Sequence, residues 1–560
     1  MPASPIRKLV PLAEAARARG TKIYHLNIGQ PDLPSPQTGL DALKKIDRTV
    51  LEYSPSDGYR SLREKLVGYY EQFQIKLSPD DIIVTTGGSE AVLFAFMSCL
   101  NPGDEIIVPE PAYANYMAFA ISAGAVIRPV VSSIEQGFAL PDVAEFEKLI
   151  NDRTRGILIC NPNNPTGYLY TRKEMNRIRD LVKKYDLFLF SDEVYREFIY
   201  TGSPYISACH LEGIEQNVVL IDSVSKRYSE CGIRIGALIT KNRTLRNAVM
   251  KFCQARLSPP LIGQIVAEAS IDAPRSYSTE VYEEYIERRK CLIDGLNRLP
   301  GVYSPIPMGA FYTVARLPVE DSDDFCAWCL SDFDYEGETV MLAPASGFYS
   351  DPACGRNEVR IAYVLKKEDL ERALVVLGKA LEASYTGKVV LKTEDNITTD
   401  HILPAGAKLL PYRSNVPYYS NYCFINVDPE FPSRCKEQGG GVIVGGANYG
   451  QGSSREHAAL VPLYLGVKAV LCKSFARIHK ANLVNSGIIP LTFADPAEYD
   501  AINLLDEISL PNVLEEVKNG EQVTVVCGGK TFKADCEVSE RQRHALLAGG
   551  TLLYARQQNK

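Results

Sequence analysis

Short apolar runs alternate with amphipathic stretches between residues 80 and 240, and this rhythm constrains the fold more than any other feature of the chain. We expect buried strands at 82–85, 105–108, 156–160, 187–190 and 218–221, and helices at 89–100, 113–123 and 172–185. Such spacing predicts an α/β fold with a mostly parallel sheet that is covered on both faces. Ligands of these sheets bind at the carboxyl ends of the strands, so the residues that follow each run are the expected site.

Composition and charge exclude several classes of function. The chain has 61 basic and 68 acidic residues, a net charge of −7 and no block of like charges, which disfavours nucleic acid and anionic membranes as partners. No run of about 18 apolar residues predicts a membrane span. The N-terminal segment lacks the apolar core of a signal peptide, so we expect a cytoplasmic protein with 14 reduced cysteines. Cys326 and Cys329 are expected to be buried packing residues, because a zinc site would need a second pair.

The residue pattern of the chain changes twice after residue 240. Residues 277–299 have a long polar helix pattern, and a closing helix is expected at 367–381. After Tyr385 the sequence becomes Gly-rich, with short strands. We therefore expect one part at 1–385 and a second at 386–560. The first would have a large domain at about 45–275 and a small α+β domain, formed by the N-terminal segment and about 276–385.

Polar groups follow the predicted strands. Residues 87–89 read GGS and begin a helix, whose backbone N–H groups can bind phosphate. Residues 161–167 read NPNNPTG, and residues 191–195 read SDEVY. Residues 223–226 read SVSK, with GIRIG at 232–236. Taken singly, these groups are typical of turns, helix caps and solvated lysines.

Taken in order, the groups resemble fold-type I pyridoxal-phosphate enzymes of the class I/II aminotransferase family. The resemblance covers about residues 5–383 and rests on the motifs GGSEA, PEPAYANY, NPNNPTG, SDEVY, SVSK…GIRIG and VRIAY. It implies pyridoxal 5′-phosphate as the cofactor. It also implies transfer of an amino group from an amino acid, such as aspartate, to a 2-oxoacid such as 2-oxoglutarate. A β-lyase or a cyclising synthase on the same fold is the alternative, because a fold does not settle a reaction.

The resemblance assigns roles to four residues that follow the predicted strands. Lys226 would carry the cofactor and, once released by the substrate amine, would move the proton at the substrate Cα. Asp192 would keep the ring nitrogen of the cofactor protonated, which makes the ring an electron sink. Tyr195 and Asn164 would hydrogen-bond the phenolic oxygen of the cofactor. Lys226, Asp192 and Tyr195 are therefore the expected catalytic residues.

Other residues match positions that hold the substrate and the rest of the cofactor. Arg360 would bind the substrate α-carboxylate through two parallel hydrogen bonds, with Asn164 beside it. Gly29 would leave room over that carboxylate. Tyr53 would reach the phosphate in a neighbouring subunit, which implies a homodimer. The remaining residues implied for cofactor binding are Gly88, Ser89, Tyr113, Ser223, Ser225 and Arg234.

The second part carries a Gly-rich loop, GGGVIVGGANYGQGSSREH, at 439–457. Together with DNITTDHI at 395–402 and SFARIH at 474–479, this loop resembles the C-terminal swivel domain of aconitase, over residues 387 to about 550. By that resemblance Ser453 would be the catalytic base. Arg455 and Arg413 would bind substrate carboxylates, Ser454 would assist, and Asp400 would support Arg413.

Aconitases hold an iron–sulfur cluster in larger domains that have no counterpart in this sequence, so we expect no metal site. Three interpretations of the second part stay open. It would pair with a separate aconitase-type large subunit, act as a binding or assembly module for acidic metabolites, or have no function.

Overall fold

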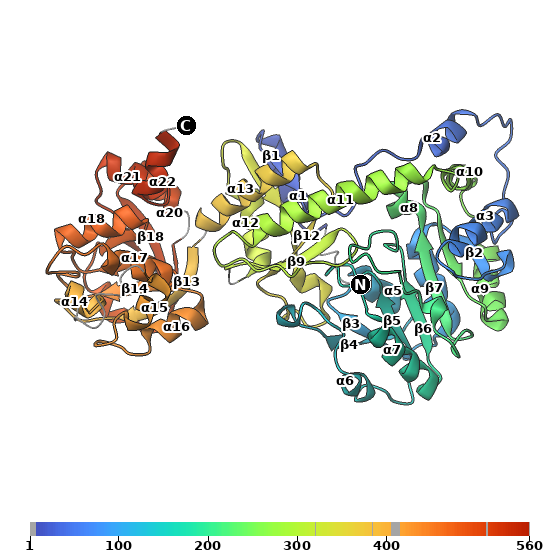
Figure 1. The fold of residues 1–560 in the computed structure, drawn as a ribbon, viewed down its shortest axis with the longest axis horizontal. Coiled ribbons are helices and arrows are strands. Elements are labelled where there is room, and N and C mark those ends of the chain that lie inside the picture. The colour runs from blue at the N-terminus through green and yellow to red at the C-terminus, as the bar shows by residue number, and fades with distance from the viewer. Residues whose placement is uncertain (1–6, 320, 384, 405–414, 511–512, 559–560) are drawn as a thin grey trace. The chain divides into compact units, whose positions relative to one another are not determined.

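The computed structural model describes residues 7–319, 321–383, 385–404, 415–510 and 513–558. The chain divides into two compact units, shown as a ribbon in Figure 1. The first unit is Met1–Leu317 with Asp321–Val376, and the second is Pro318–Glu320 with Leu377–Lys560. The sequence-based boundary at 385/386 stays a prediction.

A seven-stranded sheet, in the order β2-β8-β7-β6-β5-β3-β4, is the centre of the first unit. Among these described strands, only β8 runs antiparallel to its neighbours, so the predicted mostly parallel α/β fold is confirmed. The strands are β2 (Ile82–Thr85), β3 (Glu105–Glu110), β4 (Val126–Val131), β5 (Thr154–Cys160), β6 (Phe188–Asp192), β7 (Val218–Ser223) and β8 (Gly236–Ile239).

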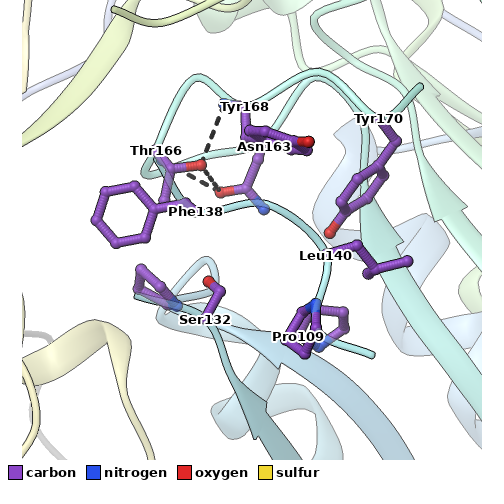
Figure 2. A pocket seen from close by; sticks show the side chains of 10 residues that line it. Pro109, Ser132, Phe138, Leu140, Asn163, Thr166, Tyr168 and Tyr170 are labelled. Atoms are coloured by element: carbon purple, nitrogen blue, oxygen red, sulfur yellow. Dashed lines mark hydrogen bonds between the residues drawn. The ribbon is translucent and has the colours of Figure 1, made fainter. Parts of the chain in front are cut away.

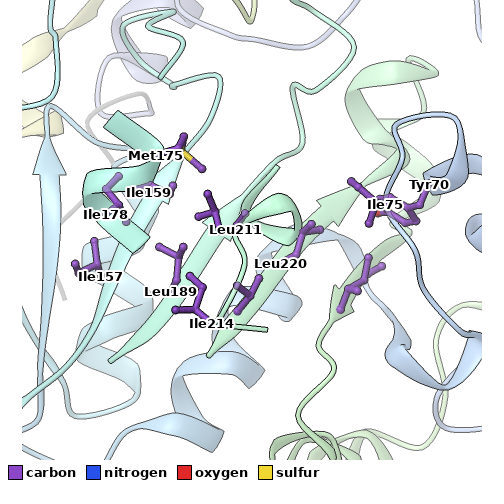
Figure 3. Packing of buried hydrophobic residues seen from close by; sticks show 14 of the residues in the cluster. Tyr70, Ile75, Ile157, Ile159, Met175, Ile178, Leu189, Leu211, Ile214 and Leu220 are labelled. Atoms are coloured by element: carbon purple, nitrogen blue, oxygen red, sulfur yellow. The ribbon is translucent and has the colours of Figure 1, made fainter. Parts of the chain in front are cut away.

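Helices cover both faces of this sheet. Successive side chains of a strand point to opposite faces, so neighbouring residues of one strand pack against different helices. Ile159 and Leu189 belong to a buried cluster with Met175 of α7 (Arg172–Tyr185), as Figure 3 shows. Phe190, the next residue on β6, instead packs on Phe96 of α4 (Gly87–Cys99), with ring centroids 5.3 Å apart. The other helices here are α2 (Gln37–Lys44), α3 (Arg60–Glu71), α5 (Asn115–Ser122), α6 (Val143–Glu147), α8 (Val224–Arg227), α9 (Arg243–Arg256) and α10 (Leu261–Ser270).

A smaller lobe of the same unit combines the N-terminal segment with the region from residue 275 onward. Strand β1 (Lys22–His25) pairs in parallel with β10 (Glu338–Met341). An antiparallel sheet has the order β11-β12-β9, from β9 (Tyr312–Arg316), β11 (Ala343–Pro344) and β12 (Glu358–Ala362). The helices are α1 (Val10–Ala18), α11 (Arg275–Leu296), α12 (Ser322–Ser331) and α13 (Lys367–Ala383). Cys326 and Cys329 lie on α12 as free thiols, each 1% exposed, as expected for packing residues.

The second unit is a closed barrel with the strand order β13-β14-β15-β16-β19-β18-β17. Its strands are β13 (Tyr385–Lys392), β14 (Gly441–Gly445), β15 (Val467–Cys472), β16 (Ile489–Phe493), β17 (Glu507–Leu510), β18 (Gln522–Cys527) and β19 (Lys530–Asp535). The first four are parallel, so the loops after them lie at one end of the barrel.

The described helices of this unit are α14 (Thr399–Ile402), α15 (Val416–Tyr419), α16 (Phe431–Gln438), α17 (His457–Tyr464), α18 (Arg477–Ser486), α19 (Glu498–Ala501), α20 (Val513–Asn519), α21 (Glu540–Leu547) and α22 (Thr551–Gln558). In the described parts of both units, no helix combines the length and the apolar character needed to cross a bilayer.

Candidate active site

Lys226 lies on the four-residue helix α8, directly after the carboxyl end of β7. Ser223 caps this helix, because its Oγ accepts a hydrogen bond from the backbone N–H of Ser225 at 3.1 Å. The Ser223 hydroxyl also donates to Ser225 Oγ at 2.8 Å. Lys226 Nζ donates to the carbonyl of Gly29 at 2.8 Å and lies 3.9 Å from Cys231 Sγ. The lysine after the sheet therefore meets the N-terminal segment.

Asp192 is the last residue of β6, and it is 7% exposed. Burial, with smaller contributions from the carboxylates of Asp222 and Glu193, raises the pKa of its carboxyl to about 6. The hydroxyl of Tyr116 opposes this shift by donating to Asp192 Oδ2 at 2.6 Å. A carboxylate in such surroundings is stabilised by a facing cation, such as a protonated ring nitrogen. The sequence analysis missed Tyr116, although the motif PEPAYANY contains it.

Asn164 lies in the turn that follows β5. Its neighbour Asn163 holds the turn together, since Asn163 Oδ1 accepts from the backbone N–H of Thr166 at 3.2 Å and from its hydroxyl at 3.0 Å (Figure 2). Thr166 Oγ1 in turn accepts from the backbone N–H of Tyr168 at 3.1 Å. A cavity of about 10 Å³ lies beside the turn, room for about one water molecule. The turn holds Asn164 so that its Nδ2 donates to the hydroxyl of Tyr195 at 3.3 Å.

Tyr312, on β9, connects these groups, and the sequence analysis did not single it out. Its hydroxyl lies 3.0 Å from the hydroxyl of Tyr195 and donates to the Gly29 carbonyl at 3.4 Å. A Cβ atom at Gly29 would stand 1.7 Å from the Tyr312 hydroxyl. Residue 29 must therefore be glycine for Tyr312 to occupy this place.

Arg360, on β12, is 2% exposed. Its guanidinium lies between the rings of Tyr312 and Phe348, at 4.8 and 4.9 Å from the centroids. Nη1 donates to Asn164 Oδ1 at 3.2 Å, and Nη2 donates to the Asn27 carbonyl. Burial lowers the pKa of the guanidinium, and Nε has no hydrogen-bond partner among the described residues. A buried guanidinium with a spare N–H is suited to bind a carboxylate.

The start of α4 and Arg234 form a cradle at the other end of the site. Gly88 and Ser89 lie in the first turn of α4, where backbone N–H groups have no partner within the helix. A Cβ atom at Gly87 would stand 2.4 Å from Arg234 Nη2, so this approach requires glycine. The guanidinium of Arg234 is exposed, and a Cβ at Gly88 would lie 3.8 Å from the Asp222 carbonyl at the end of β7. Helix amides and a guanidinium in one place suit a phosphate dianion.

Two predicted cofactor contacts lie apart from this chain of hydrogen bonds. The hydroxyl of Tyr113 accepts from Asn115 Nδ2 at 2.7 Å, and burial raises the pKa of Tyr113 to about 12. Tyr53 is 75% exposed and is not joined by a hydrogen bond to the described residues of the site.

The residues predicted in the second unit lie at one end of the barrel. Ser453 and Ser454 are exposed in the loop after β14. Arg455 Nη1 donates to Asp400 Oδ1 at 2.7 Å. Arg413, which we expected beside Asp400, lies outside the described residues. In the described part of the chain, no group of three His, Cys, Asp or Glu side chains is arranged to hold a metal ion.

A lysine after β7, a buried acid at the end of β6 and a buried arginine on β12 define a pyridoxal-phosphate enzyme of fold type I. The chain belongs to the aminotransferase class I and II family, whose model matches residues 21–377. Residues 416–496 match the model of the aconitase C-terminal domain. Both resemblances inferred from the sequence are therefore confirmed.

Known relatives cover the first unit. Aspartate aminotransferase of Pyrococcus horikoshii is 32% identical over 373 residues, which are 64% of this chain and 91% of that protein. Aromatic-amino-acid aminotransferase 2 of Thermococcus litoralis is 30% identical, over 68% of this chain and 96% of that protein. The solved structure of an alanine aminotransferase from Pyrococcus furiosus has a TM-score of 0.63 at 30% identity, over 68% of this chain and 97% of that one.

Proposed function

We propose that this protein transfers the amino group of an amino acid, with aspartate as the first candidate, to a 2-oxoacid such as 2-oxoglutarate. The observation that supports this proposal is a continuous set of contacts between the lysine and the arginine of the site. The contacts run from Lys226 through Gly29, Tyr312, Tyr195 and Asn164 to Arg360. A small amino acid held by its carboxylate at one end therefore has its amine and Cα near the other.

The residues fit pyridoxal phosphate. Asp192 is a buried carboxylate that needs a cation, and the start of α4 with Arg234 suits a dianion. When bound, this cofactor supplies an electron-withdrawing ring that stabilises the negative charge developing at the substrate Cα. Asp192 would hold a proton at the ring nitrogen, and Tyr195 and Asn164 would hydrogen-bond the phenolic oxygen. Ser223 and Ser225 would add their hydroxyls to the phosphate cradle, and Tyr113 would pack against the ring.

The remaining steps belong to side chains of this chain. Arg360 binds the α-carboxylate and fixes the direction of the substrate Cα–H bond. The Lys226 amine would take the proton from the substrate Cα and pass it to the cofactor, which keeps the amino group, as a positioned general base and then acid. Tyr312, whose hydroxyl contacts both the Gly29 carbonyl and the Tyr195 hydroxyl, would hold these two groups in place.

Labelling tests this assignment. Purified protein supplied with pyridoxal phosphate should absorb visible light, and borohydride reduction should fix the cofactor on Lys226, as read by peptide mass spectrometry. Lys226→Ala should lose the label and at least about 10²-fold in rate, because it loses the proton-moving group. A label on another lysine would contradict the proposal.

The names of the relatives do not identify the amino donor, because they cover aspartate, aromatic amino acids and alanine. A screen of donors would identify it. Arg256, a candidate for holding a second carboxylate, is already paired with Glu90 at 2.7 Å and with the Ser56 carbonyl at 2.9 Å. Each amino acid should be offered with 2-oxoglutarate and the glutamate formed should be measured. Aspartate is expected to lead, and a faster aromatic or aliphatic donor would replace it.

A homodimer is part of the proposal. Tyr53 is 75% exposed, and its neighbours Val50 and Leu51 are 67% and 61% exposed. An apolar loop of this kind is typical of a surface that another protein covers. A second copy of the chain is the partner that would place Tyr53 at a cofactor phosphate.

The second unit is proposed to bind di- or tricarboxylates through Arg455 and to be catalytically silent alone. The loop that carries Ser453 and Ser454 is anchored, because Thr399 Oγ1 donates to the Ser453 carbonyl at 3.2 Å. Its exposed hydroxyls leave this face open to a small acid or to a separate aconitase-type large subunit.

A further inference from the structure

A buried charge pair lies directly next to the lysine of the site. Arg227 follows Lys226 on α8, but its side chain is only 2% exposed. Its Nη1 donates to Asp222 Oδ1 at 3.1 Å and its Nη2 to Asp222 Oδ2 at 2.9 Å, a bidentate contact. Asp222 lies on β7 and is 1% exposed on its side chain. The short helix that carries Lys226 is therefore tied to the end of the strand that precedes it.

The same pair reaches the strand that carries Asp192. Arg196 Nη1 lies 3.5 Å from Asp222 Oδ2, and Arg196 Nη2 lies 3.2 Å from Glu193 Oε2. Glu193 is the residue after Asp192. Tyr70 of α3 donates a further hydrogen bond to Asp222 Oδ2. The ends of β6 and β7, which present the acid and the lysine of the site, are thus joined by buried ions.

Stability alone is a poor explanation for this arrangement. A buried ion pair is often no better than a well-packed apolar pair of the same volume, because both charges lose their hydration. In a medium of low dielectric, however, such charges act strongly on their neighbours. The carboxylates of Asp222 and Glu193 already raise the pKa of Asp192, so the field of this network reaches the reacting groups.

We propose that Arg227 and Asp222 are a positioning pair, which sets the place of the Lys226 nitrogen and its affinity for a proton. This inference rests on the proposed function, in which Lys226 carries the cofactor. Beside Lys226 Nζ, the titratable neighbour is Cys231, at 3.9 Å. The charged and titratable groups packed around the pair are Tyr69, Tyr70, Glu193, Arg196, Glu197 and Tyr228.

Two substitutions with opposite effects on charge test the pair. Arg227→Met removes a positive charge and leaves Asp222 negative, so the Lys226 nitrogen should bind its proton more tightly. Asp222→Asn removes the negative charge, so that nitrogen should release its proton more easily. The pH at which the absorption of the Lys226-bound cofactor changes should rise in the first variant and fall in the second, by roughly 0.5 unit or more.

A structural role would not produce shifts of opposite sign, because loosening of α8 would act in the same direction in both variants. Arg63→Met is the matched control: Arg63 is 6% exposed and pairs at 3.3 Å with Asp57, a carboxylate other than that of Asp222. It should lower the melting temperature without moving the spectral midpoint. If Arg227→Met does not fold, Arg227→Gln removes the same charge and should shift the midpoint upward.

Shifts of the same sign, or none, in folded variants would overturn the pair while leaving the proposed function intact. An unlabelled Lys226 in the unchanged protein would overturn both.

Discussion

Arg360 is a cation in a place where a cation is costly. Arg360 is 2% exposed, and its guanidinium contacts an amide oxygen, a backbone carbonyl and two aromatic faces. Arg360 has no counter-ion among these contacts, so an incoming carboxylate would meet a preorganised partner. This is the residue on which the affinity for every amino-acid substrate should depend.

Substitution of Arg360 should therefore affect all donors alike. Hydrogen bonds to charged groups contribute about 1.5–3 kcal/mol, so Arg360→Ala should lower kcat/KM by at least about tenfold for each donor. Arg316→Ala is the control, because Arg316 lies on β9 with a 37% exposed side chain and pairs with Glu135. Steady-state kinetics on several donors measure the effect. Unchanged kinetics in Arg360→Ala would assign the carboxylate to another residue.

Asp192 makes the stability of the cofactor-free protein depend on pH. Its pKa is about 6 in the folded protein, against an ordinary value of 3.8. Between these values the folded state binds more protons than the unfolded state, so stability falls as pH rises from about 4 to about 6. Above that range the ionised carboxylate costs on the order of 3 kcal/mol.

Asp192→Asn should accordingly stabilise the cofactor-free protein at pH 8 and have little effect at pH 4. The same substitution should weaken the binding of pyridoxal phosphate, because the ring nitrogen loses its counter-ion. Melting curves at the two pH values and a cofactor titration measure both effects. A lower melting temperature of the cofactor-free variant at pH 8 would show that the carboxylate has another partner.

The sequence assigns roles to residues within motifs more readily than to the residues around them. Lys226, Asp192 and Arg360 each lie in an ordered motif, so the resemblance assigns them roles, which stay predictions. Tyr312 and the Asp222–Arg227 pair are not found, because their importance arises from contacts between segments that are distant in the sequence or from burial. A tyrosine on a strand and an arginine after a lysine have no pattern that distinguishes them from ordinary residues.

Elements are predicted best where local signals agree. Helix α7 has the predicted bounds, 172–185, because Thr171 and Glu174 form a capping box and its apolar residues face the sheet. Strand β4 was not predicted, since it lies at the edge of the sheet, is partly exposed and contains Pro129. Strand β8 was not predicted either; it has only four residues, and the first of them, Gly236, is the last residue of the motif GIRIG.

The loop between α2 and α3 carries Tyr53 and should serve the neighbouring subunit. Tyr53→Ala and Lys226→Ala are each expected to be impaired alone. Mixed dimers of the two contain one site with both native residues, so random exchange should restore about a quarter of the wild-type activity. Activity after mixing, with hybrids verified by differently tagged chains, measures this. Verified hybrids without recovery would mean that each site is built within one chain.

At the scale of the whole molecule, each unit has what it needs to fold. The sheet of the first unit has its own buried cluster, which includes Ile157 and Met175. The barrel of the second has two others, one around Val389 and Val525 and one around Phe424. The cofactor residues end at Arg360, and helix α13 ends at Ala383. The two parts of the chain are therefore expected to function independently.

Separation of the units tests that independence. Truncation after Ala383 should leave a labelled, active aminotransferase, since every predicted cofactor contact and all of α13 remain.

Residues 387–560 should form no aconitate from citrate or isocitrate, even after reconstitution with iron and sulfide, because a Lewis acid must hold the leaving hydroxyl and would have to come from another chain. Calorimetry should show weak binding of di- or tricarboxylates that Arg455→Ala removes and Arg477→Ala, an arginine at the start of α18, does not. Isomerase turnover by the isolated unit would reveal a metal site, and loss of transamination on truncation would show that the aminotransferase depends on its C-terminal neighbour.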